Sequence, residues 1–227
     1  MSLAKVVQGR VAPDLLDAAA DEVRTTLIPQ FMARPGARHA SWMADRSDGR
    51  VLIVMVWADD SAVRASRRDD GQARARLAER IGLQIDAVLT MELVAVTEMA
   101  ANDEATRRWA RATWVEGAAP DLDLAFLHRE TVSDQAQSRG FAGSYWLADR
   151  EAGNGLALSF WERPADLHAS KAGSRRRRRQ LERTIGCHID HVAEYEALGA
   201  ASAEPLLDLR DLVVPSLAVP MQPVGTR

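Results

Sequence analysis

Several features that mark common protein classes are missing from this chain of 227 residues. It contains one cysteine, Cys187, so an internal disulfide is excluded and a reducing, cytoplasmic setting is expected. No apolar run approaches the roughly 20 residues of a membrane span, and the N-terminus lacks the regions of a signal peptide. The net charge of −3 offers no overall attraction to nucleic acid or to an anionic membrane. We therefore expect a globular protein with neither of these partners.

The motifs of common cofactor enzymes are also missing. The chain has no Gly-rich phosphate loop, no Ser-His-Asp order and no Cys/His spacing typical of a metal site. His188 and His191 are three residues apart on an expected strand, so their side chains point to opposite faces and do not share a metal. The sequence therefore predicts neither a bound cofactor nor a metal.

What the chain does contain is a repeat, because it aligns with itself at an offset of 104 residues. The motif Trp42-Met-Ala-Asp-Arg46 returns as Trp146-Leu-Ala-Asp-Arg150, and the ungapped segment from Gly36 to Glu92 gives 18 identities in 57 positions. Two copies of about a hundred residues suit a duplicated small domain, because solenoid repeats are much shorter. The expected division is a first repeat at 1–99, a linker at 100–107, a second repeat at 108–199 and an extended, proline-containing arm at 200–227. The arm is expected to pack on the body or on a second chain, which would make a homodimer.

Both copies show the same succession of strand and helix patterns. In the first, strands are expected at 4–11, 39–45, 51–57 and 85–96, with helices beginning at Pro13 and at Asp59 or Asp60. In the second, strands are expected at 109–114, 143–149, 156–161 and 188–196, with helices at about 121–137 and 165–183. The order β-α-β-β-α-β is the ferredoxin-like arrangement. The segment 51–56 is apolar at both its odd and its even positions, so its strand is expected to be covered on both faces.

The stretch from Arg34 to Ser66 resembles the dimeric α/β-barrel superfamily, and most of all its antibiotic-biosynthesis monooxygenase (ABM) branch. The matching features are a Pro-Gly turn, an Asp-Arg hairpin, a strand ending in Trp57 and a helix containing Ala-Ser, and the second copy repeats most of this pattern. The resemblance implies an α+β fold in which two tandem ferredoxin-like repeats form an intramolecular dimeric α/β barrel. Family members include cofactor-free oxygenases of polycyclic phenols and haem-degrading enzymes. Haem-degrading relatives use an asparagine on the first strand, which neither copy has.

Tryptophan is frequent beside the other aromatic residues: there are six, against two tyrosines and four phenylalanines. Core packing is one explanation for the four that are duplicated at the offset of 104, which are Trp42, Trp57, Trp146 and Trp161. The other explanation is a flat aromatic wall for a planar ligand between sheet and helices. In that case we expect the ligand to contact Trp109, Trp146 and Trp161, with Arg111 on the same strand face as Trp109.

The histidines are concentrated in the second copy, where four of the five lie. In a fused pair of domains one half can keep a site while the other becomes structural, so the second half is the expected location of a site. His128 and His168 are on expected helices, where either could act as a general base, with Arg111 as a cation. The alternative for each histidine is a partly exposed helix residue without a function.

Two functions follow from these patterns. The first is an ABM-like monooxygenase that acts on a planar aromatic or polyketide-type small molecule without a cofactor. The alternative is a non-catalytic small-molecule-binding or protein-interaction module on the same scaffold. An arginine run, 175–179, is expected to spread around its helix as a solvated face or as a contact with an acidic partner. An enclosed cavity with convergent polar groups in the second half would favour the enzyme, and a filled core would favour the module.

Overall fold

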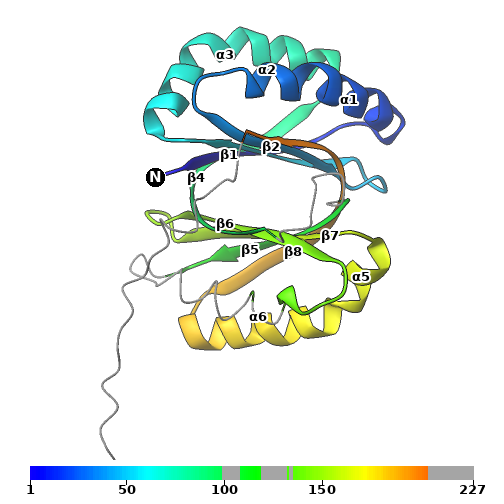
Figure 1. Ribbon diagram of the computed structural model, residues 1–227, viewed down its shortest axis with the longest axis vertical. Coiled ribbons are helices and arrows are strands. Elements are labelled where there is room, and N and C mark those ends of the chain that lie inside the picture. The colour runs from blue at the N-terminus through cyan, green and yellow to red at the C-terminus, as the bar shows by residue number, and fades with distance from the viewer. Residues whose placement is uncertain (99–107, 119–131, 133–134, 204–227) are drawn as a thin grey trace, which may run out of the picture.

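Eight antiparallel strands close into one barrel in the computed structural model of the protein (Figure 1). The structure describes residues 1–98, 108–118, 132 and 135–203. The strand order around the barrel is β1-β3-β2-β8-β5-β7-β6-β4. The strands are β1 (Leu3–Arg10), β2 (Ala37–Ala44), β3 (Arg50–Trp57), β4 (Gln84–Glu98), β5 (Trp109–Glu116), β6 (Phe141–Asp149), β7 (Asn154–Trp161) and β8 (His188–Ser202). The helices in the described residues are α1 (Leu16–Glu22), α2 (Ile28–Met32), α3 (Asp60–Arg80), α5 (Pro164–Ala169) and α6 (Lys171–Ile185), with a 3-10 turn at Pro13–Leu15 and a π turn at Val23–Leu27.

Two strands of 15 residues each, β4 and β8, join the two halves of the barrel. The first part of β4 pairs with β1 and its last part with β6, while β8 pairs first with β5 and then with β2. Both strands run past their predicted ends, because each gains hydrogen bonds from a strand of the other half. As a result β8 continues to Ser202, and residues 200–202 of the predicted arm belong to the barrel.

Side chains alternate between the inside of the barrel and its outer surface. On β3, Leu52, Val54 and Val56 point into the interior, which is a packed apolar core, while Ile53 and Met55 point outward to a second core. The prediction that this strand is covered on both faces is confirmed. The outer core of the first half lies under α1, α2 and α3, and α5 and α6 lie on the opposite side of the barrel (Figure 1).

The predicted strands are present in both halves, and the predicted helices are partly subdivided. The helix expected from Pro13 is a series of short helical segments reaching Met32, and the helix expected at 165–183 is divided at Ser170 into α5 and α6. The linker at 100–107, most of the helix expected at 121–137 and the arm beyond residue 203 lie outside the described residues. The homodimer expected through that arm stays a prediction. None of the helices in the described ranges is long and apolar enough to cross a membrane.

Candidate functional site

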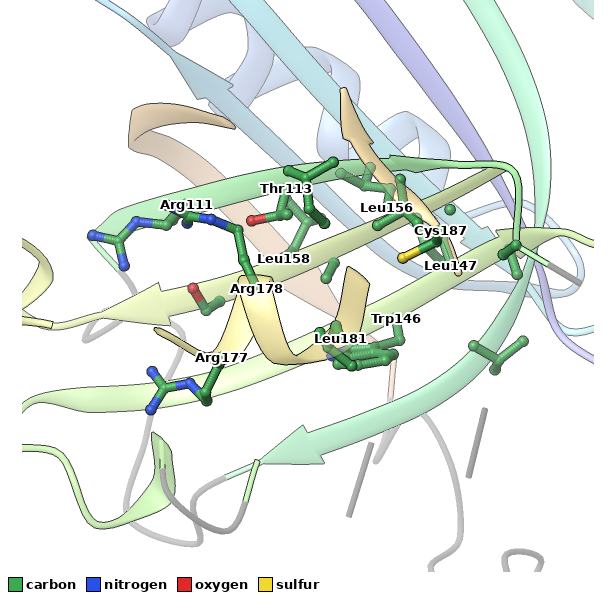
Figure 2. A pocket seen from close by; sticks show the side chains of 18 of the residues that line it. Arg111, Thr113, Trp146, Leu147, Leu156, Leu158, Arg177, Arg178, Leu181 and Cys187 are labelled. Atoms are coloured by element: carbon green, nitrogen blue, oxygen red, sulfur yellow. The ribbon is translucent and has the colours of Figure 1, made fainter. Parts of the chain in front are cut away.

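A cavity of about 100 Å³ lies in the second half of the chain, between the outer face of β5–β7 and helix α6 (Figure 2). Its strand wall is formed mainly by Thr113, Val115, Trp146, Ala148, Ala157 and Ser159. Helix α6 contributes Ser174, Arg177, Arg178 and Leu181, and Cys187 and Ile189 follow it. The walls are mostly apolar with a few hydroxyl and guanidinium groups, which is the usual composition of a small-molecule site.

The cavity exists because the outward side chains of β7 are small. At the offset of 104, Gly155, Ala157 and Ser159 correspond to Val51, Ile53 and Met55 on β3. The larger residues of β3 belong to or pack against the core under the first-half helices. The smaller residues at the matching places of β7 leave space beneath α6, whereas larger side chains occupy those places on β3.

Arg111 is the most constrained polar residue at the cavity wall, because its side chain is 3% exposed. Its Nε and Nη2 donate to Glu194 Oε1 at 3.1 and 2.9 Å, and Nη2 also donates to the Leu167 carbonyl at 2.6 Å. Its Nη1 donates to the hydroxyls of Ser170 and Ser174, both at 2.8 Å. All five N–H donors of the guanidinium are thus engaged. A ligand in the cavity would experience the positive charge of Arg111 but would find no free N–H on it.

Glu194 is the acidic partner of this cation and also of Lys171, whose Nζ lies 3.0 Å from Glu194 Oε2. Burial alone would raise the pKa of Glu194, but hydrogen bonds from Arg111 and Lys171 outweigh it and hold the pKa below its ordinary value. The carboxylate therefore stays charged, and it compensates part of the positive charge beside the cavity.

The predicted aromatic wall is divided between the cavity and a neighbouring core. Trp146 is partly exposed and lines the cavity. Trp161 is fully buried against Phe141, with its indole N–H donating to Ser159 Oγ at 3.2 Å, and it leaves no surface for a ligand. Trp109 packs against the same cluster and does not line the cavity. Of the predicted site residues in the described ranges, the binding residue Trp146 and the catalytic residue Arg111 both line the cavity.

The histidines do not supply a base within the described part of the cavity. His168 is on the exposed side of α5, where its Nε2 lies 3.3 Å from Lys171 Nζ. His128 lies outside the described residues. No histidine among the described residues lines the cavity, and within the same residues no group of three or more side chains is arranged to bind a metal.

Several lining residues were not predicted from the sequence. Thr113 follows Arg111 on the outward face of β5, so the alternation of that strand could have indicated it. Ser174, Leu181 and Cys187 gave no signal, because the packing of α6 on the sheet places them. Burial raises the pKa of the Cys187 thiol, so this side chain is a neutral wall of the cavity rather than a nucleophile.

The fold is similar to solved structures of monooxygenase-like proteins. An anthrone oxidase-like protein gives a TM-score of 0.61 at 13% sequence identity, over 91% of this chain and 95% of its own. A candidate monooxygenase from Fusobacterium nucleatum subsp. nucleatum gives 0.60 at 12% identity, over 89% of this chain and 94% of its own. Another from Lactobacillus acidophilus gives 0.55 at 12% identity, with coverages of 88% and 96%. No protein-family model and no curated protein matches the sequence. At these identities the likeness establishes the fold alone, which this chain shares with the three structures.

Proposed function

We propose that this protein is an ABM-like oxygenase that binds a planar aromatic or polyketide-type molecule in the cavity beneath α6 and oxidises it without a bound cofactor. The observation that carries the proposal is the asymmetry between the halves. Large side chains of β3 pack on the first-half core, whereas the matching small residues of β7 line a cavity with Trp146, Arg111 and hydroxyl groups on its walls. A fold shared with an anthrone oxidase-like protein supports the same class of substrate.

In such a reaction a deprotonated phenol or enol gives one electron to O2, and the carbon radical and superoxide then combine to form a C–O bond. For an activated CH2 group, loss of one water from the resulting hydroperoxide leaves a carbonyl, so that CH2 and O2 become C=O and H2O. The residues of this chain would contribute an apolar, water-poor wall and the positive charges of Arg111 and Arg178, which favour the anionic form of the substrate. The proposed base is His128.

The alternative is a non-catalytic binding module on the same scaffold. The observation that favours it is that His168 faces away from the cavity, so the described part of the site lacks a base. The two functions share the ligand and differ in turnover.

Tryptophan fluorescence titration with polycyclic phenols and quinones, followed by oxygen-uptake measurements, tests both. We expect saturable quenching that Trp146→Phe reduces and that Ala157→Ile, which fills the cavity, abolishes. His168→Ala is the matched control and should bind and turn over normally, whereas His128→Ala should bind but lose oxygen uptake. Binding without oxygen uptake in the unmodified protein would establish the small-molecule-binding module. The absence of saturable binding would refute both the oxygenase and the small-molecule-binding module, and would favour a protein-interaction module.

We also propose that the chain is a tandem duplication of ferredoxin-like repeats, so that one polypeptide forms the barrel that single-domain relatives would form as dimers. Each half contributes four strands in the same relative order, β4-β1-β3-β2 and β8-β5-β7-β6. Two ion pairs that cross between the halves, Arg46–Glu196 and Arg150–Glu92, are also equivalent at the offset of 104. Equivalent contacts in both directions are what a two-fold interface produces.

A further inference from the structure

A second, more polar hollow adjoins the cavity. This groove has a volume of about 320 Å³ and lies between α6, β8 and the β2–β3 hairpin. Five cationic and two acidic side chains line it, together with Val192 and Ala193: the cations are Arg50, Arg111, Lys171, Arg175 and Arg178, and the acids are Asp45 and Glu194. Positive charge is therefore in excess along its walls.

Both carboxylates in the groove already have cationic partners. Asp45 accepts a hydrogen bond from Arg50 at 3.0 Å, and Glu194 is bound by Arg111 and by Lys171. These contacts neutralise three of the five cations in part. The charges of Arg175 and Arg178 are left over.

Arg175 and Arg178 are three residues apart, which places them on one side of α6. Neither guanidinium group forms a hydrogen bond or an ion pair with any residue in the described ranges. Arg178 is partly buried, and burial together with the nearby charges of Arg111 and Arg175 lowers its pKa, which the carboxylate of Glu182 offsets only in part. A guanidinium held beside other cations, with few of its donors satisfied, creates a strong local preference for an anion.

The groove and the cavity share two residues, Arg111 and Arg178, so they are immediate neighbours. We propose that they form one binding site, in which Arg175 and Arg178 hold an oxyanion group of a ligand whose aromatic part occupies the cavity. This inference rests on the proposed function and narrows its ligand to an aromatic carboxylate. Planar guanidinium groups bind carboxylates through paired N–H donors, whereas the cavity walls accept an apolar ring.

The arginine run provides its own controls. Arg176 and Arg179 carry the same charge on the same helix, but both are exposed and neither lines the groove or the cavity. A substitution of either one changes the net charge of the protein as much as a substitution of Arg175 or Arg178 does.

Isothermal titration calorimetry at low ionic strength tests the proposal with three probes: 2-naphthoate, the neutral 2-naphthamide and inorganic phosphate. We expect 2-naphthoate to bind at least about tenfold more tightly than 2-naphthamide, since hydrogen bonds between oppositely charged groups contribute about that much. Arg175→Gln and Arg178→Gln should remove this advantage and leave 2-naphthamide binding within about twofold, while Arg176→Gln and Arg179→Gln change neither. Arg175 is exposed, so its variant should retain the wild-type melting temperature and keep the test valid if Arg178→Gln is unstable.

Each of the other outcomes refutes a specific part of the proposal. Equal binding of the two naphthalene probes, blocked in both cases by Ala157→Ile, would overturn the anion site and leave the proposed function intact. Phosphate binding that depends on Arg175, without binding of either naphthalene probe, would show a site for a free oxyanion and would refute the combined ligand. If no probe binds, the anion site is refuted, and the fluorescence titration with neutral phenols decides the proposed function separately.

Discussion

Exchanging the residues at one matched position should fill space in the second half of the protein and open space in the first. Ala157 on β7 corresponds to Ile53 on β3 at the offset of 104, and the first lies at the cavity while the second packs on the first-half core. An empty volume of about 100 Å³ costs roughly 2.4 kcal/mol at about 24 cal/mol per Å³. That figure is an upper limit for what filling the cavity restores, because polar groups on its walls can bind water.

Ala157→Ile should therefore raise the free energy of unfolding by between zero and about 2 kcal/mol, whereas Ile53→Ala should lower it by about 2–3 kcal/mol. Urea unfolding followed by circular dichroism measures both, and the fluorescence titration of the same samples should show that only Ala157→Ile loses ligand binding. A loss of more than about 1 kcal/mol in Ala157→Ile would mean that the isoleucine meets packed atoms, and the reasoning about the cavity would fail.

Three further predictions concern the residues that hold the second half together. Arg111→Met should lower the free energy of unfolding by about 3 kcal/mol, measured by urea unfolding at pH 7. This is the lower end of the range for breaking a buried ion pair, because Glu194 is 29% exposed and retains its ion pair with Lys171. The folded-state pKa of Glu194 lies below its ordinary value of 4.5, so its contribution to stability is present above that pH and is lost on acidification through the folded pKa. In thermal melts from pH 7 to pH 3, the melting temperature of Arg111→Met should therefore fall less than that of the unmodified protein. An equal fall in both proteins would contradict the pairing. Gly140→Ala should lower the free energy of unfolding by at least about 2 kcal/mol, because φ is +69° and the new Cβ would lie 2.4 Å from an Asp166 carboxylate oxygen. Gly186→Ala, where φ is +67° but the space is open, should lower it by only about 1 kcal/mol. Equal losses of stability in differential scanning calorimetry would exclude the close contact.

The sequence was sufficient for most of the barrel because its strands carry apolar residues at alternating positions. The segment 51–57 predicted a strand covered on both faces, and β3 has an interior row and a row facing the helices. The ends of β4 and β8 could not be predicted in the same way. Their last residues are held by partner strands of the other half, and pairing between distant segments is not encoded in local spacing.

The candidate site was predicted only in part, for a related reason. Alternation on one strand placed Arg111 and Trp109 on the same face, which the structure confirms. Trp161 is conspicuous in the sequence, yet it fills the core, because large aromatic residues are as useful for packing as for binding. The better signal was the replacement of Ile53 and Met55 by smaller residues at the offset of 104, since smaller side chains leave the space that forms a cavity.

Because β4 and β8 pair with strands of the other half, some strands of the first half lack their partners while the chain is being synthesised. Until β6 and β8 exist, the edge of β2 and the last residues of β4 have no hydrogen-bonding partners, because His39 pairs with Ser202, far along the chain. At about 5–20 residues per second, a ribosome needs roughly 5–30 s to make the remaining part. During that interval the nascent first half carries two open sheet edges, which are templates for pairing with other chains. Newly made protein should therefore depend on chaperones far more than the finished barrel does.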